Sequence, residues 1–130
     1  MAEFAREHVE GALNLFRAED WPSYTTDPER TWRALTAAGS VTVVALDGGE
    51  VVGLAQIQGD GEIQAHLSIL VVAAAHRRRG IARGLLAEAL RRAGGKRIDL
   101  ISRTEDFYPG LGARRFHGFR IVREDLGLEP

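Results

Sequence analysis

The sequence predicts an α/β protein built around a mixed β-sheet, and three observations lead to this prediction. Residues 40–72 hold three β-rich runs separated by the turn sequences "DGG" and "GDG", a pattern typical of an antiparallel meander. A helical repeat over residues 80–93 leads into the short run "RIDLIS", and a strand–helix–strand unit favours parallel neighbours. Two amphipathic segments precede these strands.

Composition limits the classes of function that the chain can have. The chain has 130 residues, a formal net charge of −1 and no cysteine. Its length predicts one domain, residues 1–130, and its charge argues against a general nucleic-acid binder. Without cysteine it has no disulfide, no thiolate nucleophile and no cysteine zinc site. Neither a signal peptide nor a bilayer-spanning run is visible, so we expect a soluble cytoplasmic protein.

The first predicted elements are two helices joined by a loop. Residues 7–18 carry apolar side chains at a helical period, and His8 is expected on the surface of this helix. The prolines of "DWPSYTTDP" interrupt the pattern. Asp27 is then expected to cap a second helix, with Pro28 at its first position, that runs toward Gly39.

The third predicted strand, "EIQAHLSILVV", alternates between apolar and polar residues. Because successive side chains of a strand point to opposite faces, the alternation assigns each residue to a face. The expected core face carries Ile63, Ala65, Leu67, Ile69 and Val71. The expected polar face carries Gln64, His66 and Ser68.

The last third of the chain begins with the helix over residues 80–93, whose apolar stripe suits packing on a sheet. The dipeptide "GG" ends this helix before the short run "RIDLIS". Residues 113–122, "ARRFHGFRIV", are expected to be extended, with a tight hairpin at His117–Gly118.

Residues 71–84, "VVAAAHRRRGIARG", join a strand to a helix through three arginines and a glycine. The first N–H groups of a helix lack internal partners and, with the helix dipole, suit a phosphate group. Gly80 permits close approach, and a neighbouring arginine adds a bidentate contact. Neither the Walker signature nor the dinucleotide fingerprint is present. The residues alone therefore leave open a phosphate site, a solvated basic turn and, disfavoured by the charge, a nucleic-acid contact.

This stretch resembles motif A of the GNAT superfamily of acyl-CoA N-acyltransferases, whose pattern is Q/R-x-x-G-x-G/A. Arg77 stands at the Q/R position, Gly80 at the first glycine and Ala82 at the last position. Val72 matches the valine that ends the family's fourth strand.

A second segment, "DFYPGLGARRF", is similar to the family's FYxxLGF segment, with Ala113 in place of the usual phenylalanine. The order of predicted elements is also that of the family, and the resemblance is best over residues 41–116. The family's opening strand is missing or very short, and little chain remains for its last strand. The matching positions of the second segment are Phe107, Tyr108, Leu111 and Gly112.

The resemblance implies a GNAT-like fold: a central mixed, mostly antiparallel sheet that splays between the fourth and fifth strands, with about four flanking helices. It implies acetyl-CoA as the acyl donor and no metal. The strand backbone would pair with the pantetheine arm, and the amides of the turn would hold the diphosphate. The implied cofactor-binding residues are Leu70, Val71, Val72, Arg77, Arg78, Arg79, Gly80, Ile81, Ala82 and Arg83.

The chemistry that the resemblance implies is direct attack of an amine on the thioester in a ternary complex. Positioning of the reactants and backbone N–H groups near Val72 would lower the barrier. Tyr108 is the candidate acid for the leaving thiolate, with a packed aromatic ring as the alternative. His66 is the candidate base, directly or through water, with a structural histidine as the alternative.

The resemblance places acceptor recognition in the loop between the first two helices. Trp21 and Tyr24 are expected to wall an acceptor pocket there, or else to pack within the loop. Glu19 or Asp20 would attract a cation.

Two functions of different classes follow from these observations. The first is an N-acetyltransferase that acts on a primary amine of a small molecule or a protein. The second is a non-catalytic CoA-binding sensor or scaffold. A homodimer, in which a partner subunit completes the last strand, is a further expectation that the resemblance raises.

Overall fold

The computed structural model describes residues 1–104 and 106–130, and it divides the chain into two compact units, residues 1–99 and residues 100–130. The first unit contains the whole β-sheet and the four α-helices. The described residues of the second unit form two short 3-10 helices, and the rest of that unit is irregular chain.

The sheet of the first unit has five strands in sequence order, β1-β2-β3-β4-β5. The pairs from β1 to β4 are antiparallel, whereas β4 and β5 are parallel, so the predicted mixed, mostly antiparallel sheet is confirmed. The strands are β1 (Ala2–Glu3), β2 (Ser40–Asp47), β3 (Glu50–Gly59), β4 (Gln64–Val72) and β5 (Arg97–Asp99). The helices of this unit are η1 (Arg6–His8), α1 (Val9–Ala18), α2 (Pro22–Thr25), α3 (Pro28–Leu35), η2 (Ala74–His76) and α4 (Ile81–Ala93).

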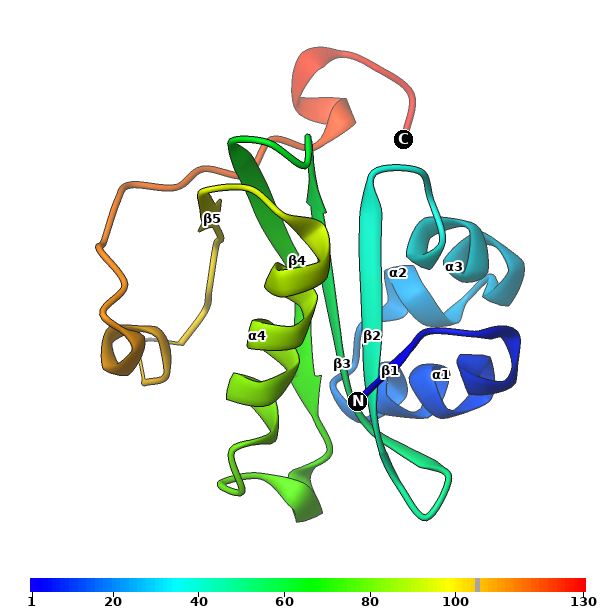
Figure 1. The fold of residues 1–130 in the computed structure, drawn as a ribbon. Coiled ribbons are helices and arrows are strands. Elements are labelled where there is room, and N and C mark those ends of the chain that lie inside the picture. Colours follow the sequence, from blue (N-terminus) through cyan, green and yellow to red (C-terminus); the bar gives the residue numbers. More distant parts are fainter. Residues whose placement is uncertain (105) are drawn as a thin grey trace. The chain divides into compact units, whose positions relative to one another are not determined.

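The α-helices cover both faces of the sheet, with α4 on one face and α1, α2 and α3 on the other (Figure 1). Two glycines allow helix and strand to approach closely. A Cβ atom on Gly11 of α1 would lie 2.7 Å from Val51 Cβ, and one on Gly53 of β3 would lie 2.8 Å from Leu85 Cδ1 of α4. The core therefore has two layers, one on each side of the sheet.

The N-terminal helices follow the expected signals, with one correction. Asp27 caps α3 by accepting the N–H of Arg30 at 3.2 Å, as predicted, although the helix ends at Leu35, before Gly39. The expectation that His8 lies on the surface is wrong. His8 is buried, and its Nδ1 accepts the N–H of Ala5 at 3.0 Å, which fixes the entry to α1.

The strand β4 contains a β-bulge that the regular alternation did not predict. Ile57 of β3 pairs with Leu67, but its neighbour Gln56 pairs with Ile69, so Ser68 is an extra residue. Cross-strand partners share a face of the sheet, whereas consecutive residues of a strand, such as Gln56 and Ile57, lie on opposite faces. Their partners Ile69 and Leu67 therefore lie on opposite faces as well. The prediction of one continuous core face along β4 is therefore wrong at Ser68.

The bulge places His66 on the side of the sheet that carries α1, α2 and α3. His66 pairs with Gln58, which shares a face with Gln56 because the two are two residues apart. Gln56 Nε2 donates to the carbonyl oxygen of Ala34 in α3 at 2.9 Å, which identifies the face. The side chain of His66 is exposed on that face, where β4 pairs with β5.

The parallel pairing of β4 with β5 is short. It runs from the pair of Gln64 with Arg97 to the pair of His66 with Asp99. β4 continues to Val72, and in the part of the chain that the structure describes no strand pairs with it on this edge beyond His66. The sheet is thus open between its fourth and fifth strands, as the resemblance implies.

The second unit holds η3 (Tyr108–Leu111) and η4 (Arg123–Leu126). The expected hairpin at His117–Gly118 is wrong, because residues 113–122 form no strand. The large apolar side chains between Phe116 and Leu128 are exposed.

Candidate functional site

The turn between β4 and α4 adopts a backbone conformation that explains its glycine. Gly80 is the N-cap of α4 with φ 79° and ψ 8°, and Arg78 also has a positive φ of 64°. A Cβ atom on Gly80 would meet no atom within 4 Å, so the space beside the helix start is open. The left-handed conformation favours glycine at this position, and the missing side chain leaves the neighbouring N–H groups uncovered.

The backbone N–H groups of residues 78–83 donate no hydrogen bond within the described part of the chain. The first bond of the helix is donated by the Gly84 N–H to the Gly80 carbonyl oxygen at 3.0 Å. A row of free donors at the positive end of a helix is the arrangement that binds an anion. The side chains of Arg78, Arg79 and Arg83 are exposed beside it.

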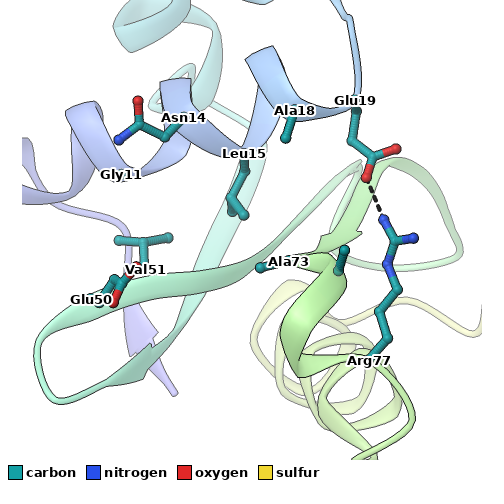
Figure 2. A pocket seen from close by; sticks show the side chains of 10 residues that line it. Gly11, Asn14, Leu15, Ala18, Glu19, Glu50, Val51, Ala73 and Arg77 are labelled. Carbon is teal, nitrogen blue, oxygen red and sulfur yellow. Dashed lines mark hydrogen bonds and ion pairs between the residues drawn. The ribbon is translucent and has the colours of Figure 1, made fainter.

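The side chain of Arg77 is directed toward the end of α1 (Figure 2). Its Nε donates to the carbonyl oxygen of Val72 at 3.0 Å, and its Nη2 forms an ion pair with Glu19 Oε1. The guanidinium is half-exposed. Its role as a diphosphate ligand stays a prediction.

The open edge of β4 carries the other predicted cofactor contacts. The N–H of Ala73 donates to the carbonyl oxygen of Val52 on β3 at 2.8 Å. Because the hydrogen-bonding direction alternates along a strand, the backbone groups of Leu70 and Val72 face the open edge, and those of Val71 face β3. The carbonyl of Val72 already accepts Arg77 Nε, which leaves the Val72 N–H.

Tyr108 begins η3 in the second unit. Its ring contacts Phe107 edge-to-face, with 5.1 Å between the ring centroids. Burial raises the pKa of the Tyr108 phenol above its usual value of 10.0, because the phenolate loses solvation. The phenol is therefore protonated throughout the neutral pH range.

Trp21 and Tyr24 pack together at the end of α1. Their ring centroids lie 5.8 Å and 5.0 Å from that of Phe16, and 6.3 Å from each other. Both rings are partly buried against the core. Their role as walls of an acceptor pocket stays a prediction.

A cavity of about 420 Å³ lies between α1 and the ends of β3 and β4 (Figure 2). Three of its lining side chains carry carboxylate or amide oxygens, Glu19, Glu50 and Asn14, and Arg77 closes one side. The remaining lining residues are Gly11, Leu15, Ala18, Val51, Ala73 and Ala74. Carboxylate and amide side chains therefore share the lining of this cavity with small and apolar residues.

Sequence reasoning missed most of this cavity. Glu50 reads only as the residue after the "DGG" turn, and no local pattern connects it to α1. Gly11, in the middle of a helix, is the one available signal, because an interior glycine often marks a close approach. Gly11 packs closely against Val51 of β3, which also lines the cavity.

Two negative findings apply to residues 1–104 and 106–130. No group of three or more His, Cys, Asp or Glu side chains in this range could hold a metal ion. No helix in it is long and apolar enough to cross a membrane.

Comparisons with known proteins identify the family. The model of the Acetyltransferase (GNAT) family matches residues 6–119. No curated protein matches the chain. Among solved structures, an acetyltransferase from Trypanosoma brucei is 23% identical with a TM-score of 0.70, covering 92% of this chain and 95% of that one.

Two further solved structures have the same fold. A GNAT family acetyltransferase from Streptococcus pneumoniae is 28% identical with a TM-score of 0.69, and the match covers 88% of this chain and 91% of that one. The enzyme AAC(6')-Iy, in complex with a bisubstrate analogue of CoA, is 20% identical with a TM-score of 0.70, covering 93% and 94% of the two chains. Because the family match spans most of its length, this chain belongs to the GNAT acetyltransferase family.

Proposed function

We propose that this protein is an N-acetyltransferase that moves the acetyl group of acetyl-CoA to a primary amine by direct attack in a ternary complex. The observation that carries the proposal is the row of free N–H groups over residues 78–83, which begins a few residues after the open edge of β4. Coenzyme A combines a diphosphate with an extended amide-containing arm. These two features of the chain match those two parts of the cofactor.

The start of α4 holds the diphosphate in this proposal. The N–H groups of Arg78, Arg79, Gly80, Ile81, Ala82 and Arg83 supply donors, and the helix dipole adds a favourable field. The left-handed Gly80 leaves room for the oxygens to approach the backbone. The exposed arginine side chains of the turn add positive charge around this site.

The edge of β4 aligns the donor with the acceptor. The backbone groups of Leu70 and the N–H of Val72 pair with the pantetheine arm as an added strand does. An N–H that faces this edge also stabilises the oxygen that becomes negative when the amine attacks. The sulfur of the thioester leaves as a thiolate, and the bond to the amine nitrogen replaces the one that breaks.

Protons move at two residues in this reaction. Tyr108 gives its phenolic proton to the leaving thiolate, and the second proton that the amine nitrogen loses as the amide forms restores the phenol, whose raised pKa keeps it protonated at neutral pH. His66 takes the proton of the acceptor ammonium, directly or through water, from its exposed position on the α1–α3 side of β4.

The acceptor enters on the side of α1 in this proposal. The acceptor loop, residues 19–26, contains Trp21 and Tyr24, and the carboxylate of Glu50 lines the adjacent cavity, where Glu19 is paired with Arg77. Negative side chains attract a cationic amine. Some structural neighbours are described as aminoglycoside acetyltransferases, which favours a polyamine-like acceptor as the first to be tried.

The cofactor site is tested by calorimetric titration of acetyl-CoA. The parent protein should bind, and Gly80→Glu should bind at least about 100-fold more weakly, because its carboxylate fills and repels the phosphate site. Gly39→Glu is the matched control: its φ of 81° is also left-handed, but it precedes β2 at the opposite end of the sheet. Equal binding by Gly80→Glu and the parent protein would show that the site is misplaced.

The transfer reaction is tested by thiol release with a panel of primary amines: neamine, spermidine and a lysine-containing peptide. Release above the rate without amine supports the transferase. If acetyl-CoA binds and none of these amines accelerates thiol release, the non-catalytic CoA-binding module becomes the better description.

A further inference from the structure

We propose that Glu19 and Arg77 are positioning residues, which together hold the acceptor loop against the end of β4. The inference rests on the proposed function, since it places Glu19 beside the site of the acceptor amine and Arg77 beside the site of acetyl-CoA. Arg77 lies in the turn that precedes α4, and Glu19 lies 58 residues earlier, at the end of α1. The ion pair between them joins these distant segments (Figure 2).

The Arg77 end of this link is fixed by a second contact. Nε donates to the carbonyl oxygen of Val72 at 3.0 Å, while Nη2 of the same planar group pairs with Glu19. A guanidinium presents its donors in a rigid fork, so holding one side of the fork orients the other. The position of the Glu19 carboxylate is thereby tied to the last residue of β4.

The Glu19 end is fixed by the way in which α1 stops. The N–H of Trp21 donates to the Phe16 carbonyl at 3.0 Å and that of Asp20 donates to the Arg17 carbonyl at 3.1 Å. With Asp20 at a φ of 58°, these two bonds form a Schellman motif, which closes a helix tightly. Glu19 is the last residue before this closure, so its side chain leaves from a rigid base.

The position of the acceptor loop depends on the position of Glu19, because the loop begins at this residue. The Trp21 ring stacks on Phe16, and the Tyr24 ring packs on the same side chain. A shift of the Glu19 end would therefore move the proposed acceptor contacts together. Both members of the ion pair also line the cavity of about 420 Å³, so the pair connects α1 to the turn before α4 at one side of that cavity.

The same geometry removes the Arg77 side chain from the diphosphate. Its guanidinium is engaged at Val72 and Glu19, and the pairing carboxylate offsets its charge. The free N–H groups of residues 78–83 need no help from this side chain. Loss of Arg77 should therefore disturb the acceptor side and spare acetyl-CoA binding.

The test is a double-mutant cycle with Arg77→Gln, Glu19→Gln and the double variant. The first measurement is amide hydrogen exchange over residues 19–26. Each single variant should raise this exchange about fivefold, the factor that an exposed ion pair supplies, and the double variant should add nothing further. The dissociation constant of acetyl-CoA should change less than about twofold in all three. Arg91→Gln is the control, because it breaks an ion pair with Glu88 on the exposed side of α4.

A kinetic measurement separates positioning from mere stabilisation. With the best amine of the panel, both single variants should raise the KM of the amine and leave the KM of acetyl-CoA unchanged. Arg77→Lys should restore part of the loss, because the ammonium can pair with Glu19 but lacks the fork that also holds Val72.

Two results would overturn the inference. One is unchanged exchange over residues 19–26 in every variant. The other is a tenfold or larger loss of acetyl-CoA affinity in Arg77→Gln but not in Glu19→Gln, which would make Arg77 a phosphate ligand. Both measurements are independent of turnover, so a failure of the proposed transfer reaction would be recognised separately.

Discussion

The two units of this chain differ in how far their large apolar side chains are buried. In residues 1–99 most large apolar side chains are buried, and Leu13, Phe16, Leu54 and Leu85 are entirely so. In residues 100–130 every described side chain, Tyr108 included, is at least partly exposed, and Phe119 is 84% exposed. The first unit has a sheet with helices on both faces, whereas the described residues of the second unit form only two short 3-10 helices and irregular chain. Burial here follows from the presence of a second layer rather than from hydrophobic composition.

The sharpest way to break this comparison is to truncate one phenylalanine in each unit. Phe16→Ala should lower the free energy of unfolding by about 3–5 kcal/mol, because it leaves a cavity between α1 and the sheet. Phe119→Ala should change it by less than about 0.5 kcal/mol. Urea unfolding measures both. A loss above about 1 kcal/mol for Phe119→Ala would contradict the contrast and would indicate that its ring is covered in solution.

For catalytic activity, in contrast to stability, a substitution in the second unit should have a large effect. Tyr108→Phe should lower turnover about 100-fold and leave both acetyl-CoA affinity and unfolding free energy unchanged, since it removes only the proposed proton donor. Because burial raises the pKa of this phenol, turnover that depends on it should fall only as the pH rises above the ordinary value of 10.0. Steady-state rates from pH 6 to 10.5 check this. Full turnover in Tyr108→Phe would remove Tyr108 from the mechanism.

The effect of an added methyl group can also be compared between the two units, by replacing one glycine in each with alanine. Gly53→Ala should cost about 1–3 kcal/mol, because its Cβ would lie 2.8 Å from Leu85 Cδ1 and 3.2 Å from the carbonyl oxygen of Val71. Gly110→Ala in the second unit meets nothing within 4 Å and should be almost neutral. Thermal unfolding of the two variants is the measurement. Equal melting temperatures would mean that α4 moves away from the sheet without cost.

The smallest effect is expected on the surface of the well-packed unit. Two arginines, Arg91 and Arg92, hydrogen-bond Glu88 and lower its pKa from 4.5 to about 2. A lowered pKa means that the stabilisation is present above pH 4.5 and is lost as the pH falls toward 2. Glu88→Gln should therefore unfold slightly more easily than the parent at pH 7, and the difference should disappear toward pH 2. A difference that stays constant with pH would exclude these ion pairs as its cause.

Much of the fold could be predicted from the sequence, because its signals are local. The meander, the Asp27 cap and the helix start at Gly80 each depend on a few neighbouring residues. The bulge at Ser68 does not, since it exists only relative to β3. The burial of His8 and the irregular path of residues 113–122 likewise depend on what surrounds them.

The candidate site divides in the same way. The free N–H groups at the start of α4 follow from one short motif. The ion pair of Arg77 with Glu19 and the contribution of Glu50 to the cavity join segments far apart in the chain. No periodicity or spacing encodes such contacts, so they became visible only in three dimensions.

The extra residue in β4 has a consequence for how the length of this chain can vary. Removing Ser68 would make Leu67 and Ile69 consecutive and would restore a regular ladder, yet both would keep their present cross-strand partners, Ile57 and Gln56. A one-codon deletion there would thus preserve the interior and straighten only the bend of the strand. The direction of the open edge of β4, and with it the orientation of a ligand that binds along it, can therefore change in this fold while the buried side chains stay the same.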